Sequence, residues 1–324
     1  MTARATRALA GTALAAAGAL AWATVEARWY TLREVTVPVL PPGQQPLRIL
    51  HLSDLHLTHD QRRKVDWVRD LATLGADLVV DTGDNWASLD AMPALLHALE
   101  PHLERPGAFV WGSNDFFAPR PKNPARYLLP DARSDGSDEP PVELPWRELG
   151  RRFTSAGWVD LTNARGVVEA GGRRISLVGT DDAHRDVDRF PAAGGPDDVR
   201  PHPVTDEGTG LVRAADGDVD LHLGVTHAPY RRVLDAMAAD DVDLVLAGHT
   251  HGGQLAVPLY GALVTNCDLD RGRAKGLHGW PGPRPDAPGG ADSTWLHVSA
   301  GLGTSPYAPV RFACRPEATL LTLV

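Results

Sequence analysis

The sequence contains very little cysteine. Its 324 residues include only two, Cys267 and Cys314. Two thiols are too few for the disulfide framework of a small secreted domain, and too few for a zinc site built from thiolates. The two could form one bridge, but we expect two unrelated packed thiols. A metal site in this chain would then be built from oxygen and imidazole ligands.

The chain also lacks an excess of positive charge. It has 32 Lys and Arg against 41 Asp and Glu, a formal net charge of −9 at pH 7. Broad nucleic-acid binding depends on Lys and Arg neutralising phosphates, so we expect no nucleic-acid partner. We find no internal repeat and no long heptad run. Because 43% of the residues are hydrophobic, the chain can build a substantial core.

Charge is absent from a long N-terminal stretch. Residues 8–25, ALAGTALAAAGALAWATV, carry no charged side chain and follow Arg4 and Arg7. Eighteen helical residues span about 27 Å, marginally enough for the hydrocarbon core of a bilayer. Trp22 and Trp29 lie where interfacial aromatics are expected, and no clear cleavage site follows. The alternatives are a cleaved signal peptide and a retained signal anchor, and we favour the anchor.

The basic residues on the two sides of this stretch do not separate the two membrane orientations. The ordinary secretory route keeps the N-terminus inside, so we predict a membrane-anchored protein with an extracytoplasmic domain. Residues 1–45 would form the anchor and a linker that includes an edge strand, and residues 46–324 the domain. Two segments rich in Pro and Asp, 119–145 and 190–210, are predicted to be loop insertions.

Short apolar runs alternate with helical stretches along the domain, which is typical of an α/β fold. Helices are predicted over residues 61–74, 92–103 and 231–239. Strands, each with the loop that follows it, are predicted in LRILHLSDLHL, ADLVVDTGD, GAFVWGSND, RRISLVGTDD, VDLHLGVTHAP and VDLVLAGHTHGG. The C-terminal segments STWLHVSAGLG and EATLLTLV supply two more.

Polar side chains follow directly after five of these strands. In open α/β sheets, ligands bind outside the carboxyl ends of the strands, so these side chains are expected at one edge. Seven candidate ligands suit two divalent ions such as manganese, iron or zinc, which share a bridging carboxylate. Asp84, in the tight turn TGDN, is the predicted bridge. The seven are Asp54, His56, Asp84, Asn114, His227, His249 and His251.

The segments SDLHL, TGDN, GSND, THAP and GHTHGGQ, in this order, resemble the five motif blocks of the calcineurin-like metallophosphoesterases. The likeness is closest to their membrane-anchored or exported bacterial branch and covers about residues 47–324. It implies a layered sandwich of two mixed β-sheets flanked by α-helices, with a dinuclear centre at one edge. It further implies that the first ion is held by Asp54, His56, Asp84 and His251, and the second by Asp84, a residue of the GSND block, His227 and His249.

The third block departs from the family pattern. The family has Gly-Asn-His followed by Asp or Glu, whereas this chain has Gly112, Ser113, Asn114 and Asp115. A direct alignment places Ser113 in the ligand position, and a shift of one residue places Asn114 there. We favour Asn114, because an amide oxygen is a better ligand than a hydroxyl. Under either alignment, the histidine that protonates the leaving oxygen in the family is missing.

A general acid must then come from elsewhere, or the leaving group must depart without one. His184, which follows the strand in RRISLVGTDD, and His59 are the alternatives for this acid. Asp84, Asn114 and His184 are our candidate catalytic residues.

The pattern predicts metal-assisted hydrolysis of a phosphate ester by activated water. The missing histidine favours a phosphodiester, a pyrophosphate or an activated ester over an alkyl monoester. The predicted anchor favours a small-molecule or lipid phosphoester near the membrane. Two alternatives stay open: a metal-binding scaffold without activity, and a dinuclear amidohydrolase, whose H-x-H motif usually lies on the first strand.

Overall fold

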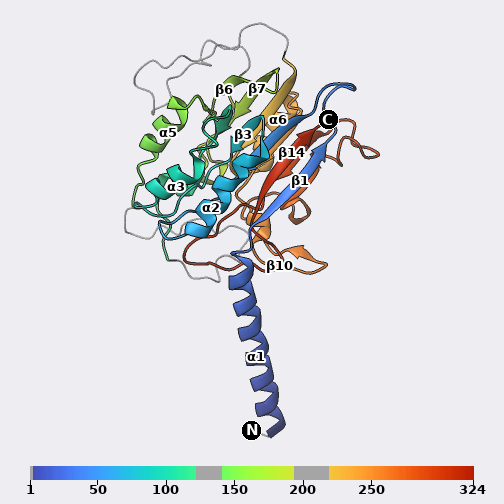
Figure 1. The fold of residues 1–324 in the computed structure, drawn as a ribbon. Coiled ribbons are helices and arrows are strands. Elements are labelled where there is room, and N and C mark those ends of the chain that lie inside the picture. Colours follow the sequence, from blue (N-terminus) through green and yellow to red (C-terminus); the bar gives the residue numbers. More distant parts are fainter. Residues whose placement is uncertain (1–2, 122–140, 193–218) are drawn as a thin grey trace.

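The fold is described for residues 3–121, 141–192 and 219–324 of a computed structural model (Figure 1). Most of the predicted insertions at 119–145 and 190–210 therefore lie outside the described residues. Both cysteines are unpaired thiols, as the sequence predicted.

The first sheet combines strands from both ends of the chain. In spatial order the strands are β1 (Thr31–Val37), β14 (Glu317–Leu323), β2 (Leu47–Leu52), β3 (Leu78–Asp81), β4 (Gly107–Phe109) and β5 (Val159–Asp160). β2, β3 and β4 run parallel to one another, β14 pairs antiparallel with β2, and β1 forms the edge beside β14. The edge strand was expected from Thr36 onward, but β1 begins five residues earlier and ends at Val37.

The second sheet has a parallel centre of four strands, with an antiparallel strand at each edge. In spatial order its strands are β12 (Gly276–Trp280), β13 (Thr294–Val298), β9 (Leu244–Ala247), β8 (Leu221–Thr226), β7 (Arg173–Gly179) and β6 (Arg165–Ala170). A separate hairpin joins β10 (Ala256–Val257) to β11 (Gly261–Ala262).

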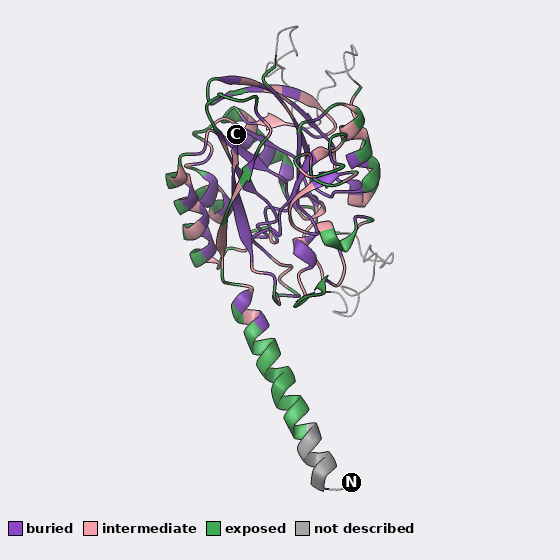
Figure 2. Cartoon of the chain, turned by 90° about the vertical axis from the view of Figure 1, so that its right-hand side faces the viewer, coloured by how far each residue is buried: buried purple, intermediate pink, exposed green. Residues whose placement is uncertain are grey.

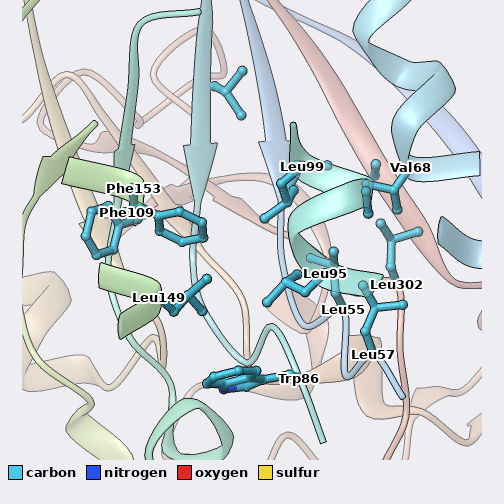
Figure 3. Packing of buried hydrophobic residues seen from close by; sticks show 14 of the residues in the cluster. Leu55, Leu57, Val68, Trp86, Leu95, Leu99, Phe109, Leu149, Phe153 and Leu302 are labelled. Carbon is cyan, nitrogen blue, oxygen red and sulfur yellow. The ribbon is translucent and has the colours of Figure 1, made fainter. Parts of the chain in front are cut away.

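Alternate side chains of each central strand face different cores, because the side-chain period of a strand is two. Ile49 of β2 packs between the two sheets, and the adjacent Leu50 faces the helices outside the first sheet. Those helices are α2 (Arg62–Asp70), α3 (Met92–Leu99) and α5 (Trp146–Ser155). Their packing on β4, through residues such as Leu95 and Phe109, is seen in Figure 3.

The outer face of the second sheet is covered by α6 (Arg231–Ala239), whose Leu234 and Met237 contact residues of β7, β9 and β13. The layers are thus helix, sheet, sheet and helix. This arrangement confirms the predicted sandwich of two mixed sheets flanked by helices.

The helices differ from prediction mainly at their ends. α6 has the predicted bounds, whereas α2 ends at Asp70 and continues as the 3₁₀ helix η1 (Leu71–Leu74). α3 ends at Leu99, four residues early, because Pro101 lacks an N–H and disfavours helical backbone in the residue before it. α5, β6 and β12 were not predicted.

The N-terminal helix α1 (Ala3–Glu26) projects from the sandwich, and its side chains from Ala10 to Trp22 are exposed (Figures 1 and 2). No helix among the described residues combines the length and hydropathy needed to cross a bilayer. The C-terminal turn of α1 is held by the domain. The buried carboxylate of Glu26 accepts hydrogen bonds from the backbone N–H of Ala313 (3.1 Å) and Cys314 (2.7 Å).

A pair of histidines is buried between the two sheets. The Nδ1 atoms of His51 in β2 and His297 in β13 lie 3.0 Å apart, so one ring donates and the other accepts. His51 Nε2 lies 3.0 Å from the hydroxyl of Thr82. Burial lowers the pKa of His297 to about 3 and that of His51 well below its usual value. Both rings are therefore neutral in the folded protein at pH 7.

We expect this pair to destabilise the fold in mild acid. The unfolded histidines take up protons below about pH 6.5 and the folded ones do not. Stability is therefore full above that pH and is lost as the pH falls towards 3. The expected loss is up to about 1.4 kcal/mol per pH unit for each histidine. Urea unfolding of the wild type and of His297→Asn between pH 7 and 4 should show a shallower slope in the variant. Equal slopes would contradict this prediction.

Candidate metal centre

The carboxyl ends of parallel strands from both sheets meet at one end of the sandwich. The loops after β2, β3 and β4 face the loops after β8 and β9 across the gap between the sheets, and each carries candidate ligands. The first sheet supplies Asp54, His56, Asp84 and Asn114, and the second supplies His227, His249 and His251. The predicted gathering of distant segments at one edge is therefore present.

One group of potential ligand atoms comes from Asp54, His56 and His251, all within 4.8 Å of one another. His251 Nε2 lies 3.4 Å from Asp54 Oδ1, and the Nε2 atoms of the two histidines are 3.2 Å apart. Two imidazole nitrogens and one carboxylate oxygen thus point into the same small space. This is a suitable donor set for a divalent transition ion.

A second group adjoins the first and consists of Asp54, Asp84 and His227. Asp84 Oδ2 lies 3.6 Å from His227 Nε2 and 3.4 Å from His56 Nε2. Asp84 therefore lies between the two groups, where the predicted bridge would be. Asp54, for which the sequence predicted one ion only, is common to both groups.

Backbone carbonyls orient the imidazole rings. His227 Nδ1 lies 2.7 Å from the carbonyl oxygen of Thr82, and His251 Nδ1 lies 3.1 Å from that of Gly303. When these Nδ1–H groups donate, the Nε2 lone pairs face the carboxylates and are free to bind an ion.

His249 is held differently. Its Nε2 lies 3.1 Å from the carbonyl oxygen of Asn266, which leaves Nδ1 as the nitrogen available to an ion. Its backbone N–H donates to Asp54 Oδ2 at 3.0 Å, and its ring centre is 5.2 Å from that of His227. His249 thus borders the second group, but it belongs to neither of the two compact groups.

The third block contacts Asp84 through Asn114. The side-chain amide of Asn114 lies 2.6 Å from Asp84 Oδ2, and its backbone N–H donates to Oδ1 at 2.8 Å. The amide oxygen and nitrogen exchange places by a flip of the side chain. Asn114 is thus placed to offer its oxygen to an ion beside Asp84. Ser113 and Asn114 are the first two residues of the short helix α4 (Ser113–Phe116).

The two candidate acids differ in position. The ring centre of His184 lies 4.5 Å from that of His249, and its Nδ1 lies 3.0 Å from the hydroxyl of Tyr230. His59 is 63% exposed and pairs with Asp90 on the surface, with 2.8 Å between Nδ1 and Oδ2. His184 therefore contacts the candidate ligand His249, whereas His59 contacts none of the candidate ligands in these interactions.

A family model described as calcineurin-like phosphoesterase matches residues 47–253, which is more than half of the chain. The chain belongs to the calcineurin-like phosphoesterase family. This assignment replaces the amidohydrolase alternative.

Several proteins are similar to this member of the family over most of its length. The phosphodiesterase YaeI of Escherichia coli K12 is 27% identical over 307 residues, which are 92% of this chain and 90% of YaeI. A transmembrane protein with a metallophosphoesterase domain from Bos taurus is 27% identical over 90% of this chain and 56% of its own. The uncharacterized protein YpbG of Bacillus subtilis is 23% identical over 87% and 82% of the two chains.

Two solved structures are also similar. TT1561 of Thermus thermophilus has a TM-score of 0.39 at 14% identity and covers 80% of this chain and 91% of its own. The purple acid phosphatase PPD1 from yellow lupin has a TM-score of 0.35 at 14% identity, over 65% and 39%.

The buried carboxylates of the candidate metal centre need a positive charge beside them. Burial raises the pKa of Asp54, His227 opposes the increase and the nearby Asp84 adds to it, so that the pKa is about 6. Burial alone would lower the pKa of His227, but Asp84, Asp182 and Asp54 together raise it to about 9. Without another cation, a proton on His227 therefore offsets the crowded carboxylates.

Two buried atoms at the centre of the site test whether metal ions fit. Among the described residues, neither Asp54 Oδ1 nor His227 Nε2 has a hydrogen-bond partner. Buried polar atoms without partners are costly, and both are good ligands for a divalent ion. The residues present therefore fit the divalent ions that the family binds.

Backbone strain gathers at the same place. A non-glycine residue with a positive φ is uncommon, and such strain concentrates at functional sites. Five of the seven candidate ligands have this conformation: Asp54 (49°), His56 (42°), Asp84 (58°), His249 (68°) and His251 (49°). The loops after the strands thus hold these side chains inward at a cost in backbone energy.

Two buried residues support the ligands, a role that the sequence did not predict for either of them. Asp115 accepts hydrogen bonds from the backbone N–H of Asp84 (2.6 Å) and Gly112 (2.9 Å), which joins the second and third blocks. Arg311 Nη2 donates to the carbonyl of Gly303 (2.7 Å) and lies 3.1 Å from His251 Nδ1. Their charge within otherwise apolar or glycine-containing segments, GSNDFF and VRFAC, was the available signal.

Proposed function

We propose that this protein is a metal-dependent hydrolase of phosphodiesters or pyrophosphates that uses a dinuclear centre. One observation carries the proposal. Two groups of buried ligand atoms, one with Asp54, His56 and His251 and the other with Asp54, Asp84 and His227, lie side by side at the carboxyl ends of the strands.

The candidate ligands form two sets, one for each ion. Asp54, His56, Asp84 and His251 would hold one ion, and the second would be held by Asp84, Asn114, His227 and His249. When bound, two such ions activate water for attack on phosphorus and neutralise the phosphoryl oxygens. The carbonyls of Thr82 and Gly303 keep the rings of His227 and His251 in the required tautomer.

Where the leaving oxygen needs a proton, His184 would supply it. It is the candidate acid whose ring contacts a candidate ligand, His249. The hydroxyl of Tyr230, 3.0 Å from Nδ1, holds the His184 ring in place. Nε2 is then the nitrogen that would deliver the proton.

The missing histidine of the third block bears on the substrate. Asn114 cannot donate a proton as an acid, and general acid catalysis contributes about 100-fold to 10,000-fold. A reaction without this acid is fastest when the leaving group has a low pKa, because such a group departs as an anion. Pyrophosphates and activated diesters have leaving groups of this kind. We therefore favour a diester or pyrophosphate over an alkyl monoester. YaeI, which is 27% identical to this chain, is named a phosphodiesterase.

The location of the reaction is part of the proposal. We propose that α1 is a retained anchor that holds the domain outside the cytoplasm and close to lipid head groups. An amphiphilic phosphoester, such as a phospholipid or a nucleotide-lipid pyrophosphate, then has the right chemistry and position for a substrate.

The test is metal reconstitution of the purified full chain. Chelator-treated protein should be inactive, and manganese, zinc or iron supplied separately should restore hydrolysis of bis-p-nitrophenyl phosphate. We expect the diester to be hydrolysed at least about tenfold faster than p-nitrophenyl phosphate. A strong monoester preference would contradict the substrate assignment. Binding of metal without turnover on any phosphoester would instead indicate an inactive scaffold.

A further inference from the structure

The inner end of α1 borders a cavity of about 420 Å³ that lies outside the metal centre. Its walls come from α1, the β10–β11 hairpin and the segment 312–315. In Figure 1 the hairpin lies beside the inner end of α1. Apolar walls are supplied by Trp22, Pro258 and Phe312, and basic ones by Arg33, Lys275 and Arg315. A volume of this size is typical of a ligand site.

The cavity carries excess positive charge. Arg33 pairs with Glu317 at 3.2 Å, but among the described residues Lys275 and Arg315 have no carboxylate within ion-pair distance. The acid in the wall, Glu26, is already engaged by backbone N–H groups. The guanidinium of Arg315 lies 3.7 Å from the centre of the Trp29 ring. Two cations thus remain to attract an anion.

The tip of the neighbouring hairpin is apolar and strained. Leu259 is fully exposed and has a φ of 70°, a conformation that glycine or asparagine adopts at lower cost. Tyr260 beside it is 61% exposed, and the guanidinium of Arg271 lies 4.6 Å from its ring centre. An apolar side chain kept at a strained and exposed tip indicates a contact surface.

We propose that this surface, which comprises the cavity, the hairpin tip 257–260, Trp22 and Trp29, docks onto a bilayer that contains anionic phospholipid. The tip and the two tryptophans would enter the interface, where aromatic side chains are favoured. Lys275 and Arg315 would bind a lipid phosphate, as basic residues near a membrane attract anionic head groups. The surface is continuous with α1, which projects from the same side of the domain.

Docking would place the metal centre at the membrane surface. The segment that lines the cavity also contacts the candidate ligand His251. Cys314 Sγ lies 3.3 Å from the carbonyl oxygen of His251, and Arg311 Nη2 lies 3.1 Å from its Nδ1. This inference concerns binding and goes beyond the proposed reaction. It also differs from anchoring by α1, because it assigns membrane affinity to residues of the domain.

Flotation of the full chain with vesicles tests the surface. One set of vesicles is phosphatidylcholine, and the other has about a third of it replaced by phosphatidylglycerol. We expect tighter binding to the anionic set. The double variant Lys275→Glu, Arg315→Glu should lose roughly 5-fold in affinity for each basic residue, on the anionic set alone. The double variant Leu259→Ser, Tyr260→Ser should bind both sets more weakly.

Two double variants away from the surface serve as controls. Arg151→Glu with Arg152→Glu, at exposed positions of α5, matches the charge change, and Val142→Ser with Val219→Ser matches the apolar one. Both should bind like the wild type. Melting curves check folding, and Lys275→Gln with Arg315→Gln replaces any charge variant that melts early.

Unchanged flotation of either double variant would overturn the proposal and leave α1 as the membrane contact. Stabilisation by inorganic phosphate that is lost in the charge variant, with vesicle binding retained, would also overturn it. The site would then be one for a soluble anion. Turnover of bis-p-nitrophenyl phosphate, measured on the same proteins, separates these outcomes from a failure of the proposed reaction.

Discussion

Asp84→Ala should reduce kcat/KM for bis-p-nitrophenyl phosphate by at least about 1,000-fold, close to 4 kcal/mol of lost transition-state stabilisation. Asp84 Oδ2 lies 3.4 Å from His56 Nε2 and 3.6 Å from His227 Nε2, so the carboxylate lies between the two ligand groups. Its removal also leaves the Asn114 amide without its partner. We expect metal analysis to show the loss of at least one of two bound ions.

Two further variants give this prediction its controls. Asp286→Ala removes an exposed carboxylate that pairs with Arg284 at 2.6 Å, and should leave turnover and metal content unchanged. Asp84→Asn keeps the size of the side chain and loses only its charge, so it should fold normally and still be inactive. Undiminished turnover by Asp84→Ala would refute the dinuclear mechanism.

Gly112→Ala should lower turnover by at least about 100-fold, because an added methyl group would occupy the space of the ligands. A Cβ on Gly112 would lie 2.6 Å from His227 Cε1 and 2.7 Å from Nε2, and would overlap Asp84 Oδ1. The backbone of Gly112 has a φ of −105°, which alanine adopts freely. The expected effect is therefore steric displacement of Asp84 and His227, with weaker metal binding and little change in secondary structure.

Gly18→Ala is the matched control, since a Cβ there meets no atom within 4 Å. Turnover and metal content of the two variants should be compared with the wild type at saturating manganese. Wild-type activity in Gly112→Ala would mean that the ligands are not held as tightly as the geometry indicates.

The motif blocks could be predicted because each is a short segment whose chemistry is local. His249 and His251 follow an apolar strand and precede two glycines, and Asp84 lies in a tight turn, so residue type and spacing were sufficient. The expectation that five such segments share one edge needed only the rule that parallel strands place their carboxyl ends together.

Long-range contacts account for what could not be predicted. Arg311 is 60 residues from His251 in sequence, and no local pattern shows that its guanidinium reaches that ring. Asp115 is the last residue of the predicted block GSND, yet its hydrogen bond to the Asp84 backbone depends on the pairing of β3 with β4. The proximity of His184 to His249 likewise requires β7, β8 and β9 to be neighbours.

By itself, the sequence determined the type of fold, the family and the identity of the candidate ligands. Strand periodicity and ligand chemistry depend on residues that are neighbours in the sequence. Only the tertiary structure decided that Asp54 belongs to both ligand groups and that His184, unlike His59, borders the site. It alone brought the end of α1, the β10–β11 hairpin and the segment 312–315 around one basic cavity. The physical reason is that these relations depend on how the two sheets pack, and packing is a property of the whole chain.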